Sequence, residues 1–539
     1  MHQGQASPIR SLPRLLIVGF LIFGTFLRVF HLDHKIFWMD EVATAVRISG
    51  YTFAETAEQL SSRPFFGLDD LHRYQFPQRI HTPGDTVHSL MAEDAQHPPL
   101  YFLLVRRWVE LIGPSVGAIR SFSVLTSLLT LPALYWLCRE LFEKTIVGEM
   151  AVVLAAVSPL HVVYAQEARP YSLWILAMTV ASALLTKALR TGQMRWLYPY
   201  ALVCSLGLYT HLLFSLAMLG HGLYVILWEK CHVTRLGLAY LGASLTAMVS
   251  FGPWLYVLWH HPPGQGLDWL EQNASFARLL TRWAGLLSRT FLDLGISPAS
   301  LDQLGLAFTV LTATVSLALL GLVAYGLYHL QRFVRKGPWI FVLCTGSATT
   351  LPLMLTYFFL GQQMFVTRYI LPITLILQVV MAFLLAKQLS VNKLPFKRRL
   401  WKLIAVFVIA CGVFSCAVRA PAMVWWNQSP TINGELPFVA QQINRSERPL
   451  VVGNATQTLT LPILQTLGHL VADKTQFQLL TEADQPFSQG RFRQIFIVDP
   501  SGDLVAALET AYGEPARPIA RWVWQVSDPI SAGAASGGS

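Results

Sequence analysis

Eleven apolar segments, each long enough to cross a lipid bilayer, constrain the fold of this chain more than any other feature. A transmembrane helix needs about 20 predominantly apolar residues. Only 13% of the 539 residues are charged, against about 25% in soluble domains. The sequence therefore predicts an α-helical polytopic membrane protein. The expected transmembrane helices lie near residues 14–31, 118–138, 146–164, 171–189, 196–211, 212–229, 236–259, 303–329, 339–360, 368–387 and 401–420.

A shorter apolar segment at residues 98–113, PPLYFLLVRRWVELIG, is interrupted by Arg106, Arg107 and Glu110. We interpret it as an amphipathic helix in the membrane interface. With the N-terminus in the cytoplasm, the basic connections RELFEK, KALRTGQMR, EKCHVTR, QRFVRKG and KQLSVNKLPFKRRLWK then all face the cytoplasm, as the positive-inside rule requires. Counting this segment as a span would place KRRLWK outside. The net charge of +10 is spread over these connections, which argues against a nucleic-acid-binding patch.

The opposite, periplasmic face holds a first outer loop at 32–117 with interfacial helices, a second long loop at 260–302, and everything beyond residue 420. Residues 421–530 have the composition of a soluble domain. PLVVGN, QFQLLT, RQIFIVDP and RWVWQVS are typical of buried strands, and LTLPILQTLGHL and GDLVAALETAYG of helices, the second ending at Gly513. We predict a membrane domain at 1–420, a small α/β domain at 421–530, and a flexible tail or linker at 531–539.

Two adjacent carboxylates, Asp40 and Glu41, follow the first apolar segment in the sequence FWMDE. Charge at the lip of the bilayer is costly, and the simplest explanation is that it marks where a helix leaves the lipid. A carboxylate also suits a general base that takes a proton from an attacking hydroxyl. The same face carries His97, in QHPPLY, and Glu167, in YAQEARPY.

Arg169 and Arg368 stand out because the short outer connections otherwise avoid positive charge. The planar fork of arginine binds phosphate through paired, charge-assisted hydrogen bonds. Each arginine also has a simpler explanation. Arg169 could form an ion pair with Glu167, and Arg368 could extend its side chain from the start of a transmembrane helix to the membrane surface. Carboxylates beside arginines at the depth of the lipid head groups indicate chemistry on a lipid-linked phosphate.

Other polar residues have simpler explanations. His97 precedes two prolines and is compatible with a rigid loop. His81, Asp85 and His88 have a spacing that suits a metal, but the TPG sequence at 82–84 interrupts a helix there, and we predict no metal site. His211 and His221 are typical of packing or pore-lining positions. The six cysteines include no CxxC pair and are interpreted as small apolar residues.

The sequences FWMDE, HPPLYF, SPLHVVYAQEARPYSL and RYILP together resemble one group of membrane glycosyltransferases. The chain is similar, over roughly residues 14–420, to the bacterial members of the protein O-mannosyltransferase-like family 39, and more distantly to the lipid A aminoarabinose transferases. The resemblance implies the GT-C fold, a donor sugar on a polyprenyl phosphate, and an active site facing away from the cytoplasm.

The resemblance also implies roles for eight residues. Asp40 is expected to be the general base, and Glu41 completes the acidic pair. The substrate-orienting residues are Glu167, Tyr171 and Tyr369. The residues expected at the donor phosphate are Arg169, Arg368 and His97, although His97 stands where the aminoarabinose transferases carry a lysine.

The expected function is therefore that of an inverting glycosyltransferase in the bacterial inner membrane. It would move a sugar from a polyprenyl phosphate to a hydroxyl of a lipid, polysaccharide or protein acceptor, with arginines in place of a metal cofactor. The alternative is a lipid-linked sugar transporter or flippase without transfer chemistry. Transporters often show paired internal repeats, whereas this sequence has no evident repeat and very unequal outer loops.

Overall fold

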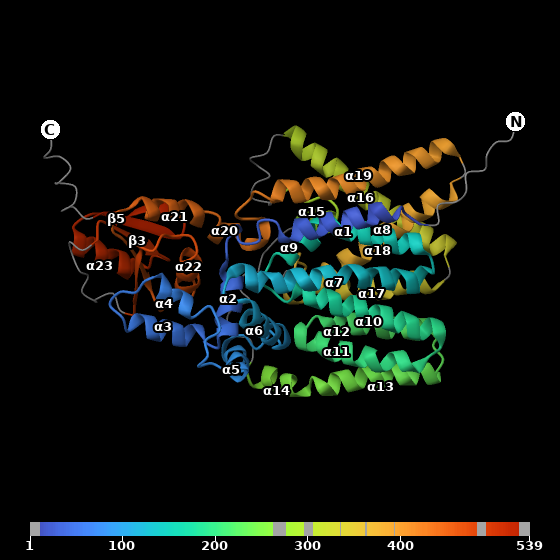
Figure 1. The fold of residues 1–539 in the computed structure, drawn as a ribbon, viewed down its shortest axis with the longest axis horizontal. Coiled ribbons are helices and arrows are strands. Elements are labelled where there is room, and N and C mark those ends of the chain that lie inside the picture. The colour runs from blue at the N-terminus through green and yellow to red at the C-terminus, as the bar shows by residue number, and fades with distance from the viewer. Residues whose placement is uncertain are drawn as a thin grey trace. The chain divides into compact units, whose positions relative to one another are not determined.

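The computed structural model describes residues 11–261, 276–295, 306–334, 336–361, 364–392, 394–481 and 492–527. These residues form two compact units (Figure 1). The helical unit comprises Met1–Leu32, Asp94–Tyr101 and Arg120–Pro421, and the sheet unit comprises Asp33–Glu93, Phe102–Ile119 and Ala422–Ser539. The predicted tail at 531–539 and much of the second long loop lie outside the described residues.

Each predicted apolar segment coincides with a helix or a bent helix pair. The elements are α1 (Arg14–Val29), α7 (Val116–Phe142), α8 (Thr145–Ala156) with α9 (Pro159–Ala165), α10 (Tyr171–Thr191), α11 (Leu197–Thr210), α12 (Phe214–Trp228), α13 (Arg235–Ser250) with α14 (Gly252–His260), α16 (Leu306–Phe333), α17 (Lys336–Leu360), α18 (Leu371–Val391) and α19 (Pro395–Arg419). A short 3-10 helix, η1 (Met194–Trp196), precedes α11, and α15 (Phe276–Ser288) belongs to the second long loop.

Among the described residues, six helices are long and apolar enough to cross a membrane, and eight if each bent pair counts as one span. The helices α1, α11 and α12 have 16, 14 and 15 residues. At 1.5 Å per residue they extend about 21–24 Å, less than the roughly 30 Å of a hydrocarbon core. The helix positions agree with the prediction, and eleven complete crossings stay a prediction.

The bend between α8 and α9 lies before Pro159, where the two helices meet at 59°. The bend exposes the carbonyls of Ala155 and Ala156, which accept hydrogen bonds from the buried Arg28 guanidinium at 3.0 and 2.8 Å. Gly24 allows the close approach of α1, because a Cβ there would lie 2.9 Å from the Cβ of Ala156. A charge inside the bundle is thus satisfied by backbone oxygens.

The sheet has five strands in the order β2-β1-β3-β5-β4. They are β1 (Pro449–Asn454), β2 (Gln476–Leu480), β3 (Gln494–Val498), β4 (Arg517–Ala520) and β5 (Val523–Ser527). β1 pairs in parallel with β2 and β3, and β5 is antiparallel to both β3 and β4. The four predicted strands are confirmed. β4 was not predicted, because its four residues include a proline and lie at the sheet edge.

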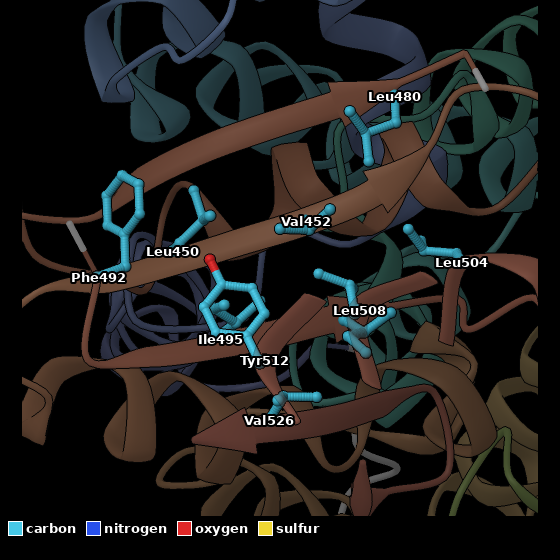
Figure 2. Packing of buried hydrophobic residues seen from close by; sticks show 10 residues of the cluster. Leu450, Val452, Leu480, Phe492, Ile495, Leu504, Leu508, Tyr512 and Val526 are labelled. Carbon is cyan, nitrogen blue, oxygen red and sulfur yellow. The ribbon is translucent and has the colours of Figure 1, made fainter. Parts of the chain in front are cut away.

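Helices α21 (Leu436–Arg445), α22 (Thr460–Leu467) and α23 (Gly502–Tyr512) accompany the sheet, after the short η4 (Trp426–Gln428) and α20 (Pro430–Asn433). The two predicted helices are α22 and α23, and Gly513 ends α23 with a φ of 69°. Alternate residues of β1, Leu450 and Val452, pack with Leu504 and Leu508 of α23 (Figure 2). This cluster is the core of the small domain.

The first outer loop contributes α2 (Met39–Ser49), α3 (Phe53–Ser61), α4 (Leu68–Arg73), α5 (Pro83–Glu93) and α6 (Leu100–Ile112). α6 is the predicted amphipathic helix. Its Arg106 is buried and donates to the backbone oxygens of Ile48, at 2.8 Å, and His81. Leu111 of α6 is 82% exposed, as expected for a helix that lies in a membrane interface.

Most of the first outer loop, Asp33–Glu93 and Phe102–Ile119, forms a single compact unit with the C-terminal domain. α2 packs against α22. Phe66, between α3 and α4, forms an antiparallel bridge with Phe477 of β2, and the two rings stack with centroids 5.8 Å apart. The bridge covers the edge of β2, which reduces the exposure of its unpaired backbone groups.

Candidate active site

Arg169 lies in the tight turn between α9 and α10 and is 5% exposed. Its Nη2 donates a hydrogen bond to Nε2 of His97 at 2.8 Å. A guanidinium has no acceptor, so Nε2 of His97 must accept, and the neutral ring carries its proton on Nδ1. That nitrogen lies 3.8 Å from a carboxylate oxygen of Asp94. His97 therefore orients the Arg169 side chain.

The same turn is fixed to the ends of two other helices by Gln166. Its amide nitrogen donates to the carbonyls of Leu27, Arg28 and Phe30 at the end of α1, at 2.9–3.2 Å. Its amide oxygen accepts from Nη1 of Arg419, the last residue of α19, at 2.7 Å. The start of α10 and the ends of α1, α9 and α19 therefore meet at one end of the bundle.

His211, directly after α11, joins the regions of Arg169 and Arg368. Its ring stacks on Trp174 of α10, with centroids 4.3 Å apart and planes 9° apart. It interacts electrostatically with His97, Arg169 and Arg368. Both predicted phosphate-binding arginines are therefore close enough to His211 for their charges to act on it. The sequence analysis interpreted His211 as a packing or pore-lining residue, and its place between two apolar segments was the available signal.

The predicted tyrosines lie around the same imidazole. Tyr171 and Tyr369 have ring centroids 6.0 and 6.2 Å from that of His211. Cζ of Arg368 lies 5.5 Å from the centroid of Tyr369, a cation–π geometry. Arg368 is partly exposed, whereas Tyr171 is 2% exposed. Arg368 therefore lies against an aromatic ring and is only partly buried.

Tyr164 of α9 lies beside these residues and contacts further ionisable side chains. It interacts electrostatically with Glu167, Arg368 and Arg289, and its ring packs edge-on against Tyr171 at 5.2 Å. Nε of Arg289 lies 3.8 Å from Asp293. Glu167 and Asp293 are buried, at 3% and 2% exposure.

Arg419 connects these side chains to one another, because it interacts electrostatically with Asp293, Glu167 and Arg120. Sequence reasoning missed this arginine and its neighbours, which become recognisable only when the helix ends meet. We call the set of linked ionisable side chains the arginine cluster. Its arginines and carboxylates among the described residues include Arg120, Arg169, Arg282, Arg289, Arg368 and Arg419 with Asp94, Glu167 and Asp293.

The arginine cluster gathers guanidinium groups and carboxylates from several helix ends and loops of the helical unit. A cluster of this composition at the end of a helical bundle is suited to an anionic ligand, and the forked geometry of arginine matches phosphate oxygens.

The acidic pair lies in the first turn of α2, where Trp38 is the N-cap residue. The amides of Glu41 and Val42 donate to the carbonyl of Trp38 at 2.8 and 2.9 Å. Carboxylates in a first helical turn are stabilised by the helix dipole. Glu41 is 0% exposed, whereas Asp40 is partly exposed. Asp40 is therefore the more exposed carboxylate of the pair. The pair belongs to the sheet unit, and its meeting with the arginine cluster stays a prediction.

In the described ranges, no group of three or more His, Cys, Asp or Glu side chains could hold a metal ion. Asp85 has a structural role, since its carboxylate accepts a hydrogen bond from the Thr82 amide at 2.6 Å, at the start of α5. This hydrogen bond lowers the pKa of Asp85 below its usual value.

Comparisons with known proteins bear on the fold and on the family that the chain resembles. A family model described as dolichyl-phosphate-mannose-protein mannosyltransferase matches residues 96–257, which contain His97, Glu167, Arg169, Tyr171 and His211. No curated protein matches the chain by sequence.

Among solved structures, the chain is similar to ArnT from Cupriavidus metallidurans in the apo state, with a TM-score of 0.51 and 14% identity over 96% of this chain and 98% of that chain. ArnT from the same organism bound to undecaprenyl phosphate gives 0.47 and 13% over the same shares. The apo oligosaccharyltransferase of Archaeoglobus fulgidus gives 0.47 and 12%, over 93% of this chain and 72% of that chain.

The family match and the ArnT fold confirm the resemblance predicted from the sequence. The chain therefore has the fold of ArnT, a GT-C-type fold, and is similar over residues 96–257 to the dolichyl-phosphate-mannose-protein mannosyltransferases.

Proposed function

We propose that this protein is an inverting glycosyltransferase that moves a sugar from a polyprenyl-phosphate donor to an acceptor hydroxyl at the periplasmic face of the bacterial inner membrane. The observation that carries the proposal is the arginine cluster, which brings guanidinium groups from several helix ends together at one end of the helical bundle. The family model that matches the chain is named for a dolichyl-phosphate mannose donor, and ArnT has been crystallised with undecaprenyl phosphate.

A group of guanidinium side chains suits the chemistry of such a donor. A prenyl-phosphate sugar is a phosphodiester with one negative charge, and the prenyl phosphate released on transfer is a monoester with up to two. Positive groups already in place therefore stabilise the developing leaving group more than the bound donor, which lowers the barrier. Arg169 and Arg368 are the proposed phosphate contacts, and His97 fixes the first of them. In this scheme no metal cofactor is required.

Asp40 is the proposed general base. An acceptor hydroxyl that gives its proton to Asp40 attacks the anomeric carbon from the face opposite the phosphate, and the carbon–oxygen bond to the phosphate breaks. One displacement inverts the stereochemistry at that carbon. Glu41, buried in the same helical turn, keeps the pair in place. Glu167, Tyr171 and Tyr369 are the proposed substrate-orienting residues.

A transfer assay tests the proposal. Purified protein in lipid nanodiscs is incubated with a panel of radiolabelled prenyl-phosphate hexoses and pentoses, with and without membranes as a source of acceptor. We expect acceptor-dependent release of prenyl phosphate that Asp40→Asn abolishes. The matched control is Asp503→Asn, which changes an exposed aspartate in the first turn of α23 in the same unit.

Two results would contradict the proposal. Uptake or transbilayer movement of every labelled donor with the sugar–phosphate bond intact would identify a transporter instead. Equal loss of transfer in the Asp503→Asn control would show that a helix-terminal carboxylate matters only for folding.

A further inference from the structure

We propose that the C-terminal α/β domain positions the acidic pair, and that Gln428 and His469 are the positioning residues through which it acts. This inference rests on the proposed function, because it assigns the domain to the same transfer reaction. All of the contacts that support it lie within the sheet unit.

The first set of contacts joins the segment entering α2 to the segment that enters the C-terminal domain. Nζ of Lys35 donates to the carbonyl of Ala422 at 2.7 Å. The amide of Ile36 donates to the carbonyl of Met423 at 3.0 Å, and the carbonyl of Ile36 accepts from Nε2 of Gln428 at 3.3 Å. Both backbone groups of Ile36 are thus satisfied by residues that precede the sheet.

Gln428 is itself held in place from two sides. It is 2% exposed, and its side-chain oxygen accepts a hydrogen bond from the amide of Trp425 at 3.0 Å. Its backbone carbonyl accepts from Nδ2 of Asn433 at 2.8 Å. The amide nitrogen that reaches Ile36 therefore has a fixed direction. Such an orientation is what a positioning contact requires.

The second set of contacts comes from His469, just beyond the end of α22. Its ring meets the ring of Phe37 edge-on, with centroids 4.9 Å apart, and stacks on His72 at 4.8 Å. Its Nε2 is hydrogen-bonded to the side-chain oxygen of Gln75, which can only accept. His469 therefore donates from Nε2, and Phe37 lies three residues before Asp40.

These contacts determine where α2 begins. Lys35, Ile36, Phe37 and Trp38 are all 3% exposed or less, and α2 packs on α22. A general base displaced by about 1 Å can cost a hundredfold in rate, so the domain that fixes this segment also fixes the base. Neither Gln428 nor His469 belongs to the core cluster of the sheet (Figure 2), so their substitution leaves that core intact.

The test uses the full-length protein and the variants Gln428→Ala, His469→Ala and His469→Gln. The matched control is Thr510→Ala, an exposed residue of α23 whose hydroxyl bonds only to its own helix. We expect the two alanine variants to lower kcat by about tenfold or more, with the donor KM changed less than about twofold, because the donor phosphate is bound by the helical unit.

Hydrogen exchange gives a readout that does not depend on activity. The amides of Ile36 and Glu41, which donate to Met423 and Trp38, are expected to exchange faster in the alanine variants, while that of Val452 in β1 is unchanged. His469→Gln should restore both kcat and protection, since its amide can donate to Gln75.

The outcomes separate this inference from the proposed function. Unchanged kcat in both alanine variants would refute the positioning role and leave the proposed function intact. Faster exchange throughout the sheet, with kcat and KM changing together, would also refute it by showing a purely structural effect. Wild-type turnover in Asp40→Asn would instead overturn the proposed function.

Discussion

Substitution of Arg368 gives the most informative prediction, because this arginine is a partly exposed member of the arginine cluster. It lies in the turn before α18, with Cζ 5.5 Å from the ring centroid of Tyr369, and interacts electrostatically with Tyr164 and His211. Arg368→Gln keeps a polar side chain of similar length but removes one positive charge and the forked donor.

The size of the effect follows from the charged hydrogen bond that Arg368→Gln can no longer make to the phosphate. A hydrogen bond to a charged group contributes about 1.5–3 kcal/mol, and about 1.4 kcal/mol corresponds to a factor of ten in affinity. The Kd for a prenyl phosphate should therefore rise about 10- to 150-fold. Since Arg368 is partly exposed, solvent screening places the expected value in the lower part of this range. Arg368→Lys keeps the charge and should fall between wild type and Arg368→Gln.

The assay is equilibrium binding of a short-chain prenyl phosphate to the purified protein in detergent. Arg195→Gln is the matched control, because Arg195 is exposed, its Cζ lies 5.4 Å from the ring of the adjacent Trp196, and it follows the end of α10 that is opposite Arg169. Wild-type affinity in Arg368→Gln would refute the assignment of the phosphate site. An equal loss in Arg195→Gln would show that binding reflects only overall positive charge.

Three further predictions concern separate parts of the molecule. Asp40→Asn should lower turnover by about a hundredfold or more while the thermal unfolding midpoint stays close to wild type; undiminished initial rates would remove Asp40 from the mechanism. Burial lowers the pKa of His72, so the unfolded chain binds a proton at this imidazole more readily than the folded protein does. The contribution of His72 to the free energy of unfolding should be fully present above about pH 6.5 and be lost as the pH drops. Thermal melts in which His72→Gln loses as much stability as the wild type over the same pH range would contradict this prediction. Gly24→Ala should destabilise the protein by about 1–3 kcal/mol, because the new Cβ meets Ala156 at 2.9 Å, whereas Gly19→Ala on the same helix, with nothing within 4 Å, should melt like wild type.

The helices of the bundle could be predicted from the sequence because each is a long apolar segment bounded by charged connections. The prolines at 159 and 253 also explain why two predicted segments are bent pairs. The number of helices that cross the membrane completely was harder to predict from the sequence. α11 and α12 are apolar but short, and their length becomes evident only when the turn at His211 is seen.

The arginine cluster shows what local patterns leave out. Arg169 and Arg368 were predicted because they are unusual in short outer connections. Arg289, Asp293 and Arg419 lie in a long loop or at a helix end, where charged residues are ordinary. Their meeting depends on which helix ends lie together, and this non-local arrangement has no signature in the spacing of residues.

The association of the first outer loop with the C-terminal domain was hidden for the same reason. Phe66 and Phe477 form a bridge across more than 400 residues of chain, and Ile36 bonds to Met423. Each segment, taken alone, has the pattern of an ordinary loop or strand. Only the fold shows that the residues before the acidic pair are held by the C-terminal domain.

The most direct test of the central claim is an experimental structure of the protein bound to a non-hydrolysable prenyl-phosphate sugar. The account predicts the phosphate within hydrogen-bonding distance, about 3 Å, of the Arg169 and Arg368 guanidinium groups, with the Asp40 carboxylate facing the anomeric carbon. A phosphate bound elsewhere, or an Asp40 too distant for an acceptor hydroxyl to bridge to that carbon, would contradict it.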